Sequence, residues 1–575
     1  GLYTTQLVNA QNRHLLNDPR WKLLVDPNPF NVSIMDSILF TDLSAKEREA
    51  MILRQANTVE HNISFSGANE QGAYALSLGT VKDDGMLIGS SLKRYNLNFN
   101  GGLNVGKNIK ITSNISAYTI SQSLPYGSFN GVSPEGGGSG GLMQRFVGVA
   151  PTVRYVNDTS GKILPGPNDV TLGNPNYWSN LTTNSTDQQR FLGGINLEYT
   201  IMRYLKLLVG ASGYYEYTNN NFFTKEYQQG NGGAMNNSRP ASFDNTKNIQ
   251  YTTNAFLQFD QKFGGHTVNA LVGGEFYDNK SYFNSGFARG AATDLIPWLA
   301  ASTAPSVLGT TIINSAGAYS NFSGWERISS AITRVNYTYL NKYLLTGIVR
   351  VDGSSRLKKG NYFGTFPGVS VGWNLHNEEF FKGSSLSKYI SSIKPRFSYG
   401  VNGNVNSLGL YATAQVYNNA GTYNGFGGTY AASYINPDVR WERAKSTNYG
   451  LDLGLFNERI SINIDYFVRN VFDKIAGLGI SAQTGFTSYS TNLGKLQNKG
   501  IELAISGKIL KSATPDGLNL EAGLNYFHVK SFAKKLPYNA LPGNRTSGFF
   551  VWDPKNPTQQ IYVGGLVEGQ RIGLD

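Results

Sequence analysis

Apolar and polar positions alternate along two neighbouring segments, 446–456 and 459–469, and this alternation is typical of much of the chain. From Tyr449 to Leu455 and from Ile460 to Val468, every second residue is Tyr, Leu, Ile or Val, and most residues between them are Gly, Ser, Asn or Asp. Side chains in a strand alternate between two faces, so both segments predict strands with one apolar and one polar face, joined by a turn at Asn457-Glu458. A polar inner face and an apolar outer face on long strands are typical of a membrane-spanning barrel.

The same alternation, broken by turn residues, predicts about sixteen strands. We place these strands at 58–68, 73–83, 93–104, 107–121, 189–201, 204–218, 248–262, 266–281, 325–339, 342–354, 363–375, 389–402, 440–456, 459–474, 493–510 and 518–531. Every second connection between them is tight. Outer-membrane barrels have short periplasmic turns and longer extracellular loops, so the alternation also predicts the direction of each strand.

The sequence therefore predicts an all-β fold, a large antiparallel transmembrane β-barrel with about sixteen of a probable 22 strands and incomplete at both ends. Residues 1–57 are expected to form an extracellular segment with a short helix from Ser44 to Arg54, because Ser44 and Glu47 have the spacing of a capping box. Residues 58–575 are expected to form the barrel portion. Its long extracellular loops are predicted at 122–188, 219–247, 282–324 and 403–439.

Composition narrows the possible classes of protein. There is no run of about eighteen apolar residues, so transmembrane helices are not expected. The chain has no cysteine, which excludes disulfides, cysteine nucleophiles and thiolate metal sites. The formal net charge is +12, but the basic residues are scattered, so we interpret them as rim and loop charges and predict no nucleic-acid partner. Attraction to an anionic outer leaflet is the second interpretation.

Candidate catalytic chemistry is weak. The five histidines lie far apart without ligand spacing, and the glycine-rich stretch 134–141 lacks the flanking strand and the Lys-Ser/Thr ending of a phosphate-binding loop. We predict no catalytic, cofactor-binding or metal-binding residues, no cofactor, and no enzyme activity. Glu378 and Glu379 are expected to be solvated on a periplasmic connection.

A series of blocks in fixed order resembles the SusC/RagA-type TonB-dependent outer-membrane transporters of Bacteroidetes. The blocks are HNISFSGANEQGAYALSLGTVKDDGML (61–87), VRVDGSSRLKKGNYFGTFPGVSVGWNLHNEEFF (349–381), IKPRFSYGVNGN (393–404), NPDVRWERAKSTNYGLDLGLFNERISINIDYF (436–467) and NLGKLQNKGIEL (492–503). Within the second block we interpret residues 352–355 as an extracellular turn in which Gly353 supplies an unusual backbone angle. Trp373 is expected in the aromatic girdle at the periplasmic end.

The resemblance implies active import of an oligosaccharide or peptide across the bacterial outer membrane. In that family a SusD-like surface lipoprotein caps the barrel, and TonB acts through a preceding region that contains a plug domain. The implied partners are therefore the lipoprotein, TonB, outer-membrane lipid and the substrate. The alternative is a passive outer-membrane porin or a surface adhesin barrel, which needs the same alternation but no plug.

Two groups of residues are candidates for the functional site. Aromatic rings in the predicted extracellular loops can stack on sugar faces, although they can equally pack the loops or contact the lid protein. The aromatic candidates for substrate or lid contact are Trp298, Tyr319, Tyr423 and Tyr430. The second group comprises polar-face charges expected to form a network in the lumen: Asp452, Asp465, Arg469, Glu502, Lys508 and Glu521.

Overall fold

The computed structural model describes residues 50, 52–124, 161–165, 174–179, 181–228, 234–297, 299, 302–304, 307–308, 311–312, 318–423, 426–510 and 517–573. Most of the helix expected at 44–54, and Trp298, lie outside these residues. At its start the described chain packs onto the connection 85–90. Ile52 is fully buried, and the Arg54 guanidinium donates hydrogen bonds to the carbonyl oxygens of Gly85 (3.0 Å) and Ser90 (2.6 Å).

One antiparallel sheet dominates the molecule, with long strands paired in chain order. Its sixteen long strands are β1 (Asn57–Asn69), β2 (Gly72–Asp84), β3 (Ser91–Val105), β4 (Ile109–Ser123), β5 (Thr182–Met202), β6 (Leu205–Thr224), β9 (Ala241–Phe263), β10 (His266–Ala291), β14 (Ala318–Tyr339), β15 (Tyr343–Ser354), β16 (Phe363–Trp373), β17 (Ile390–Asn404), β20 (Glu442–Leu455), β21 (Ile460–Gly479), β22 (Ser488–Leu510) and β23 (Leu520–Lys535). All sixteen predicted segments are strands, which confirms the all-β antiparallel fold. Among the described residues β1 does not pair with β23.

The connections between the long strands contain short strands and short helices. The short strands are β7 (Tyr227–Gln228), β8 (Met235–Asn236), β11 (Ser302–Ala304), β12 (Val307–Leu308), β13 (Thr311–Ile312), β18 (Tyr417–Tyr423), β19 (Phe426–Ala431), β24 (Phe549–Asp553), β25 (Asn556–Val563) and β26 (Arg571–Ile572). The helices are α6 (Pro175–Ser179), η2 (Leu375–Asn377), α7 (Glu379–Lys382), η3 (Ser385–Lys388) and η4 (Ala482–Thr484). None of the helices in the described part has the length and apolarity needed to span a membrane.

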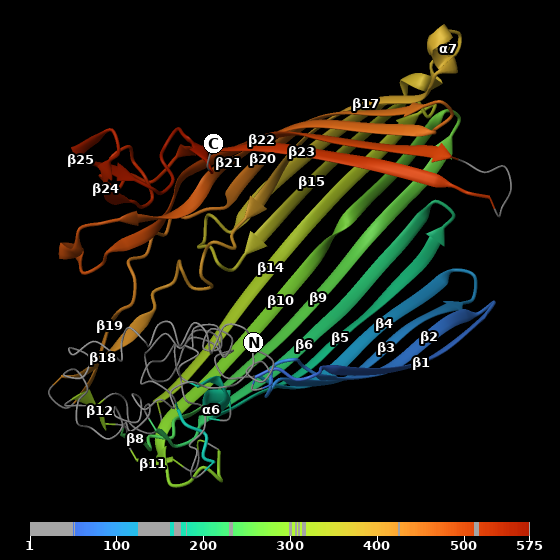
Figure 1. Cartoon of the computed structure of the whole chain (residues 1–575). Helices are drawn as coiled ribbons and strands as arrows, with labels where there is room; N and C mark the ends of the chain where they lie inside the picture. Colours follow the sequence, from blue (N-terminus) through green and yellow to red (C-terminus); the bar gives the residue numbers. More distant parts are fainter. Residues whose placement is uncertain are drawn as a thin grey trace, which may run out of the picture.

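The sheet forms a curved wall whose two ends differ (Figure 1). At one end, here called the turn end, short connections join β1 to β2, β3 to β4, β5 to β6, β9 to β10, β14 to β15 and β20 to β21, and α7 lies on the longer connection from β16 to β17 (Figure 1). The other end, here called the loop end, carries α6 and the small hairpins β18–β19 and β24–β25 (Figure 1). The predicted alternation of connections is therefore present along the wall.

The strands extend further at the loop end than the sequence predicts. β6 continues to Thr224 and β10 to Ala291, whereas we expected them to end at 218 and 281. Residues 219–221 are all Asn, so the apolar–polar alternation disappears there although the backbone ladder to β9 continues. Backbone pairing does not require one face to be apolar, and alternation detects a strand only where the two faces meet different surroundings.

The hairpin β20–β21 has the two faces predicted for it. Tyr449 lies directly opposite Tyr466 on the outer face, where both rings are exposed, and Gly450 lies opposite Asp465 on the inner face. The turn is two residues longer than expected, because the strands end at Leu455 and begin again at Ile460.

An aromatic belt runs along the outer face at the turn end. The rings of Phe263, His266, Tyr339, Tyr343 and Trp373 follow one another across five strands, with neighbouring centroids 4.7–6.4 Å apart. Trp373 is the last residue of β16, which is the girdle position expected for it. Such belts mark the boundary between hydrocarbon and headgroups.

The expectation for Glu378 was wrong. Its carboxylate lies 2.9 Å from the Lys342 ammonium and accepts a hydrogen bond from Trp373 Nε1 at 3.1 Å, so Glu378 is buried and only Glu379 is solvated. The hydrogen bonds to this carboxylate lower the pKa of Glu378 to about 2, and the bond from Lys342 has the largest effect. Sequence alternation could not reveal this, because the partners come from two other segments.

Candidate functional site: the inner face and the loop-end core

Arg396 of β17 binds two of the predicted inner carboxylates. Its Nε lies 3.1 Å from Asp452 Oδ1, and its Nη2 lies 2.6 Å from Asp465 Oδ2. Gly450 leaves room for the guanidinium, since a methyl group there would overlap it. Arg396 was not among our candidates, although it alternates with the apolar side chains of Pro395 and Phe397 in the sequence. The strand predicted at 389–402 already placed Arg396 on the polar face by parity, so the signal was present in the sequence.

The other four predicted charges also lie on the inner face by strand register. Glu502 is directly opposite Asp465, and Lys508 is directly opposite Glu521. Within the described part of the chain Arg469, Glu502, Lys508 and Glu521 make no ion pair as close as 4.0 Å. A network that includes these four residues stays a prediction.

Further charged groups on the inner face were missed by the sequence analysis. Arg190 lies 2.6 Å from Glu216 and faces the ring of Tyr118 at 5.0 Å. Arg350 Nε lies 2.6 Å from Asp352 Oδ1, and its Nη2 lies 3.3 Å from Glu275 Oε1. With Arg396 these side chains give the inner face alternating cationic and anionic groups across many strands.

Asparagines cover glycines elsewhere on the same face. A methyl group at Gly210 would lie 2.8 Å from the Asn254 side chain and 2.9 Å from that of Asn196. Asn336 Nδ2 donates to Asn269 Oδ1 at 3.1 Å, which continues the amide layer. The inner face therefore offers fixed hydrogen-bond donors and acceptors, which suit a polar solute or a polar protein surface.

A small hydrophobic core lies at the loop end, between β16 and the chain that follows β17. Strands β16 and β17 pair only from Gly368 to Gly372. The loop-end part of β16, residues 363–367, therefore pairs with β15 but not with β17. This loop-end core consists of the buried residues Leu357, Phe366, Val405, Leu408, Val439, Trp441 and Ile475. Phe366 and Trp441 meet edge to face with centroids 5.3 Å apart, and Trp441 Nε1 donates to the Tyr362 carbonyl at 2.9 Å.

Arg356 ties the loop-end core to the wall. Its Nε and Nη2 lie 2.5 and 3.0 Å from the two carboxylate oxygens of Glu326, which is only 6% exposed. It also donates to the Leu408 carbonyl, and the Thr413 hydroxyl donates to the Arg356 carbonyl at 3.0 Å. The first part of the predicted loop 403–439 is therefore fixed against the block that contains residues 352–356.

The role expected for Gly353 was wrong. It lies within β15 and has no positive φ, whereas Gly360 in the following turn has a φ of 102°. A methyl group at Gly353 would lie 2.6 Å from the Phe363 ring. Gly353 therefore lets the exposed Phe363 ring lie close to the strand and does not supply a left-handed backbone.

The aromatic candidates are spread over several elements. Tyr423 and Tyr430 both belong to the hairpin β18–β19, where Tyr430 is exposed and its hydroxyl accepts a hydrogen bond from Asn418 Nδ2 at 3.5 Å. Tyr319 lies on β14, opposite Gly286 of β10. Only Tyr423 and Tyr430 are thus placed on the same hairpin, and Trp298 lies outside the described residues. Substrate or lid contact by these residues stays a prediction.

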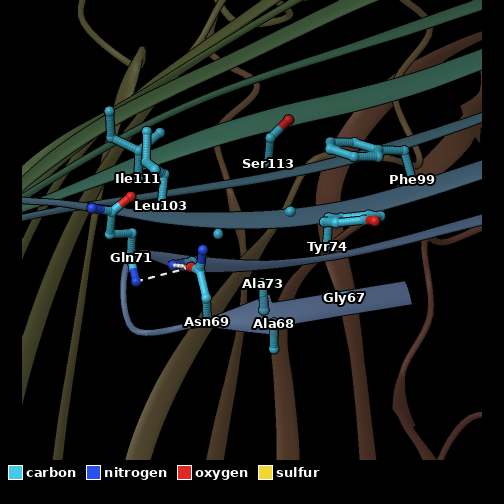
Figure 2. A pocket seen from close by; sticks show the side chains of 13 residues that line it. Gly67, Ala68, Asn69, Gln71, Ala73, Tyr74, Phe99, Leu103, Ile111 and Ser113 are labelled. Carbon is cyan, nitrogen blue, oxygen red and sulfur yellow. Dashed lines mark hydrogen bonds between the residues drawn. The ribbon is translucent and has the colours of Figure 1, made fainter. Parts of the chain in front are cut away.

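A hollow of about 580 Å³ lies near the turn end of β1–β4 (Figure 2). The rings of Tyr74 and Phe99 stand at one side and Leu103 and Ile111 at the other (Figure 2). Tyr74 shares the outer, lipid-facing side with its register partner Gly67. We therefore assign this hollow to the lipid-facing surface rather than to the inner face. No group of three or more His, Cys, Asp or Glu residues in the described ranges is arranged to hold a metal ion.

Comparison with known proteins agrees with this architecture. Residues 137–566 match the family model described as TonB dependent receptor-like, beta-barrel. TonB-dependent receptor SusC of Bacteroides thetaiotaomicron is 26% identical over 488 residues, covering 80% of this chain and 45% of SusC. The resemblance to SusC/RagA-type proteins is thus confirmed.

Solved structures of the RagAB peptide importer share the fold. Its 'closed-closed' state superposes with a TM-score of 0.71 at 21% identity, covering 85% of this chain and 52% of that chain. Its 'open-open' state gives a TM-score of 0.70 at 19% identity, covering 92% and 57%. The chain spans about half the length of these relatives.

Proposed function

Because this chain belongs to the TonB-dependent receptor-like β-barrel family, we propose that it forms the outer-membrane wall of an active importer of oligosaccharides or peptides. The observation that carries the proposal is the inner face, where Arg190, Arg350 and Arg396 each hold acidic partners in a lining of amides. A lining of this kind suits a polar solute, and it equally suits the surface of a plug domain. The turn end then faces the periplasm and the loop end faces outward.

A SusD-like lipoprotein and TonB are the proposed partners, as implied by the similarity to SusC and RagAB. The loop-end core supports this role, because it fixes the base of the loop 403–439 while leaving the hairpin β18–β19 exposed. We propose that Tyr430, together with Tyr423, contacts the substrate or the lid. Trp298 and Tyr319 remain candidates for the same contact.

The test is deletion of the gene, followed by measurement of growth on oligosaccharides and on peptides as sole nutrient. A growth defect on one class, restored by the wild-type gene, supports import of that class. Normal growth on both classes overturns the import proposal. Tyr430→Ala should reduce uptake or co-purification of the lipoprotein, and Tyr538→Ala, which removes another exposed tyrosine outside β18–β19, serves as the matched control.

A passive porin or adhesin barrel remains the second candidate, because the strand alternation fits it equally well. An active importer and a passive pore differ in whether uptake requires the inner-membrane proton gradient. Import that stops when the inner-membrane proton gradient is collapsed, or when TonB is deleted, supports the active mechanism. Uptake that continues under both conditions supports a passive pore.

A further inference from the structure

A group of lysines lies on the outer face of β20–β23, near the loop end. The group, here called the lysine rim, consists of Lys445, Lys495, Lys499, Lys530 and Lys534, with the rings of Phe472 and Phe532 between them. Strand register gives the face. Lys445 shares a side of β20 with exposed Tyr449, and Lys530 shares a side of β23 with exposed Tyr526.

The lysine rim lies at the height of the outer headgroups. Ten residues separate Lys445 from Leu455 at the turn end, which is about 33 Å along a strand. With a tilt of about 40° this becomes a rise of about 25 Å, the height of the apolar band of a bacterial barrel. Below the rim the outer face carries Ile501, Leu524 and Tyr526, all exposed. The surface therefore changes from apolar to cationic at the level where lipid phosphates lie.

Four of the five ammonium groups of the rim lie against aromatic rings, but these rings do not neutralise them. Phe472 has Lys445 at 5.1 Å and Lys495 at 5.6 Å from its centroid, and Phe532 has Lys534 at 4.9 Å and Lys499 at 5.4 Å. In the described part of the chain none of the five lysines has a carboxylate within 4.0 Å.

Two further observations point to an external anion. Lys499 and Lys530 are directly opposite one another in the ladder, and like charges in that position are destabilising unless something screens them. Asp473, an acid at the same rim, is already engaged by Arg440 at 2.9 Å and Arg443 at 2.5 Å. The chain thus leaves a lipid-facing cationic surface without its own counter-charge.

We propose that the lysine rim binds the phosphorylated headgroup of an outer-leaflet lipid. Phosphate oxygens would lie between the facing ammonium groups of Lys499 and Lys530, and the acyl chains would cover Leu524 and Tyr526 below. The aromatic rings restrict the side chains of Lys445, Lys495, Lys499 and Lys534, which lowers the entropy that these side chains lose on binding. The proposal uses the orientation given above but not the transport activity.

The experiment measures the apparent affinity of the purified full-length protein, in detergent micelles, for bis-phosphorylated lipid A and for lipid A stripped of its phosphates. The wild type should prefer the phosphorylated form. The double variant Lys499→Gln/Lys530→Gln should bind it roughly 25-fold more weakly, about fivefold for each lysine removed. Lys499→Arg/Lys530→Arg keeps both charges and should retain binding.

The matched control is Lys110→Gln/Lys394→Gln, which makes the same change in net charge on the inner face, where Lys110 opposes Glu198 and Lys394 opposes Asp452. This control should bind like the wild type. An unchanged affinity in the rim variant, an equal loss in the control, or equal binding of stripped lipid A would overturn the proposal. Displacement of lipid A by millimolar inorganic phosphate would also overturn it, because the site would then hold a free ion.

Growth on the imported nutrient is a separate measurement. A negative result for lipid A binding therefore leaves the proposed import function untouched.

Discussion

The two ends of the wall are held together in different ways. At the turn end, most of the described connections join neighbouring strands over a few residues, and side chains form hydrogen bonds with the turn backbone. Ser391 Oγ, for example, accepts from the backbone N–H of Asn457 at 2.6 Å. At the loop end, the ladder between β16 and β17 stops at Gly368, and the loop-end core with the Arg356–Glu326 pair takes its place. The turn end is therefore stabilised by hydrogen bonds to the backbone of its turns, whereas the loop end depends on a hydrophobic core and a buried ion pair.

The largest effect is expected from Arg356→Ala. It leaves the buried Glu326 carboxylate without its partner, and breaking such a pair costs about 3–5 kcal/mol. The free energy of unfolding, measured by urea titration of the protein in lipid vesicles, should fall by that amount, and proteases should cleave the chain near residues 405–413.

The control for Arg356→Ala is Arg440→Ala. Arg440 is exposed and pairs with Asp473 at the same end, so its removal should cost about 0–1 kcal/mol. Equal losses for the two variants would contradict the view that a buried pair holds the loop end.

Gly403→Ala should come second. The added methyl group would overlap the Phe366 ring and push it out of the loop-end core, at a cost of about 1–3 kcal/mol. Gly400→Ala on the same strand meets open space and should be nearly neutral in the same urea titration. If both variants unfold like the wild type, the core does not depend on close packing of Phe366.

Ser391→Ala tests the turn end. The backbone N–H of Asn457 would lose its acceptor, and the loss of one such hydrogen bond costs about 1 kcal/mol. Hydrogen exchange should accelerate in the turn 456–459 and remain unchanged in the loop-end core. Ser391→Thr keeps the hydroxyl and should behave like the wild type. Acceleration at both ends would show that the ends are coupled.

The smallest effect is a local response to acid around Glu378. Its pKa falls from an ordinary 4.5 to about 2 in the folded chain, so its contribution to stability is complete above pH 4.5 and is lost as the pH falls toward 2. The amides of Phe381 and Lys382, which donate to the Glu378 carbonyl, should exchange faster only in that range, after correction for intrinsic rates. Glu378→Gln should abolish this pH dependence, and a persisting transition would assign it to another group.

Much of the wall could be predicted from the sequence. All sixteen long strands were found, because a strand between lipid and a polar interior must alternate its side chains. The prediction was weakest where that contrast ends, as at residues 219–221, which are all Asn although the strand continues. The polar face of Asp452 and Asp465 was likewise predicted, because their side follows directly from strand parity.

The partners of these residues could not be predicted. Arg396 meets Asp452 and Asp465 across 56 and 69 positions of sequence, and Arg356 meets Glu326 across 30. The register between strands decides which side chains come into contact, and a shift by one residue would move every side chain of a strand to the opposite face of the sheet.

The sequence alone determined the fold class, the succession of strands and the two unlike faces, because these depend on the local periodicity of apolar side chains. The tertiary structure decided which charges are paired, that Glu378 is buried, and that Gly353 lies against the Phe363 ring and has no positive φ. It also showed that scattered basic residues, which sequence analysis assigned to rims and loops, gather into a lysine rim on β20, β22 and β23. Adjacent strands bring residues that are tens of positions apart in the sequence into contact. The local pattern of apolar and polar residues cannot predict such contacts.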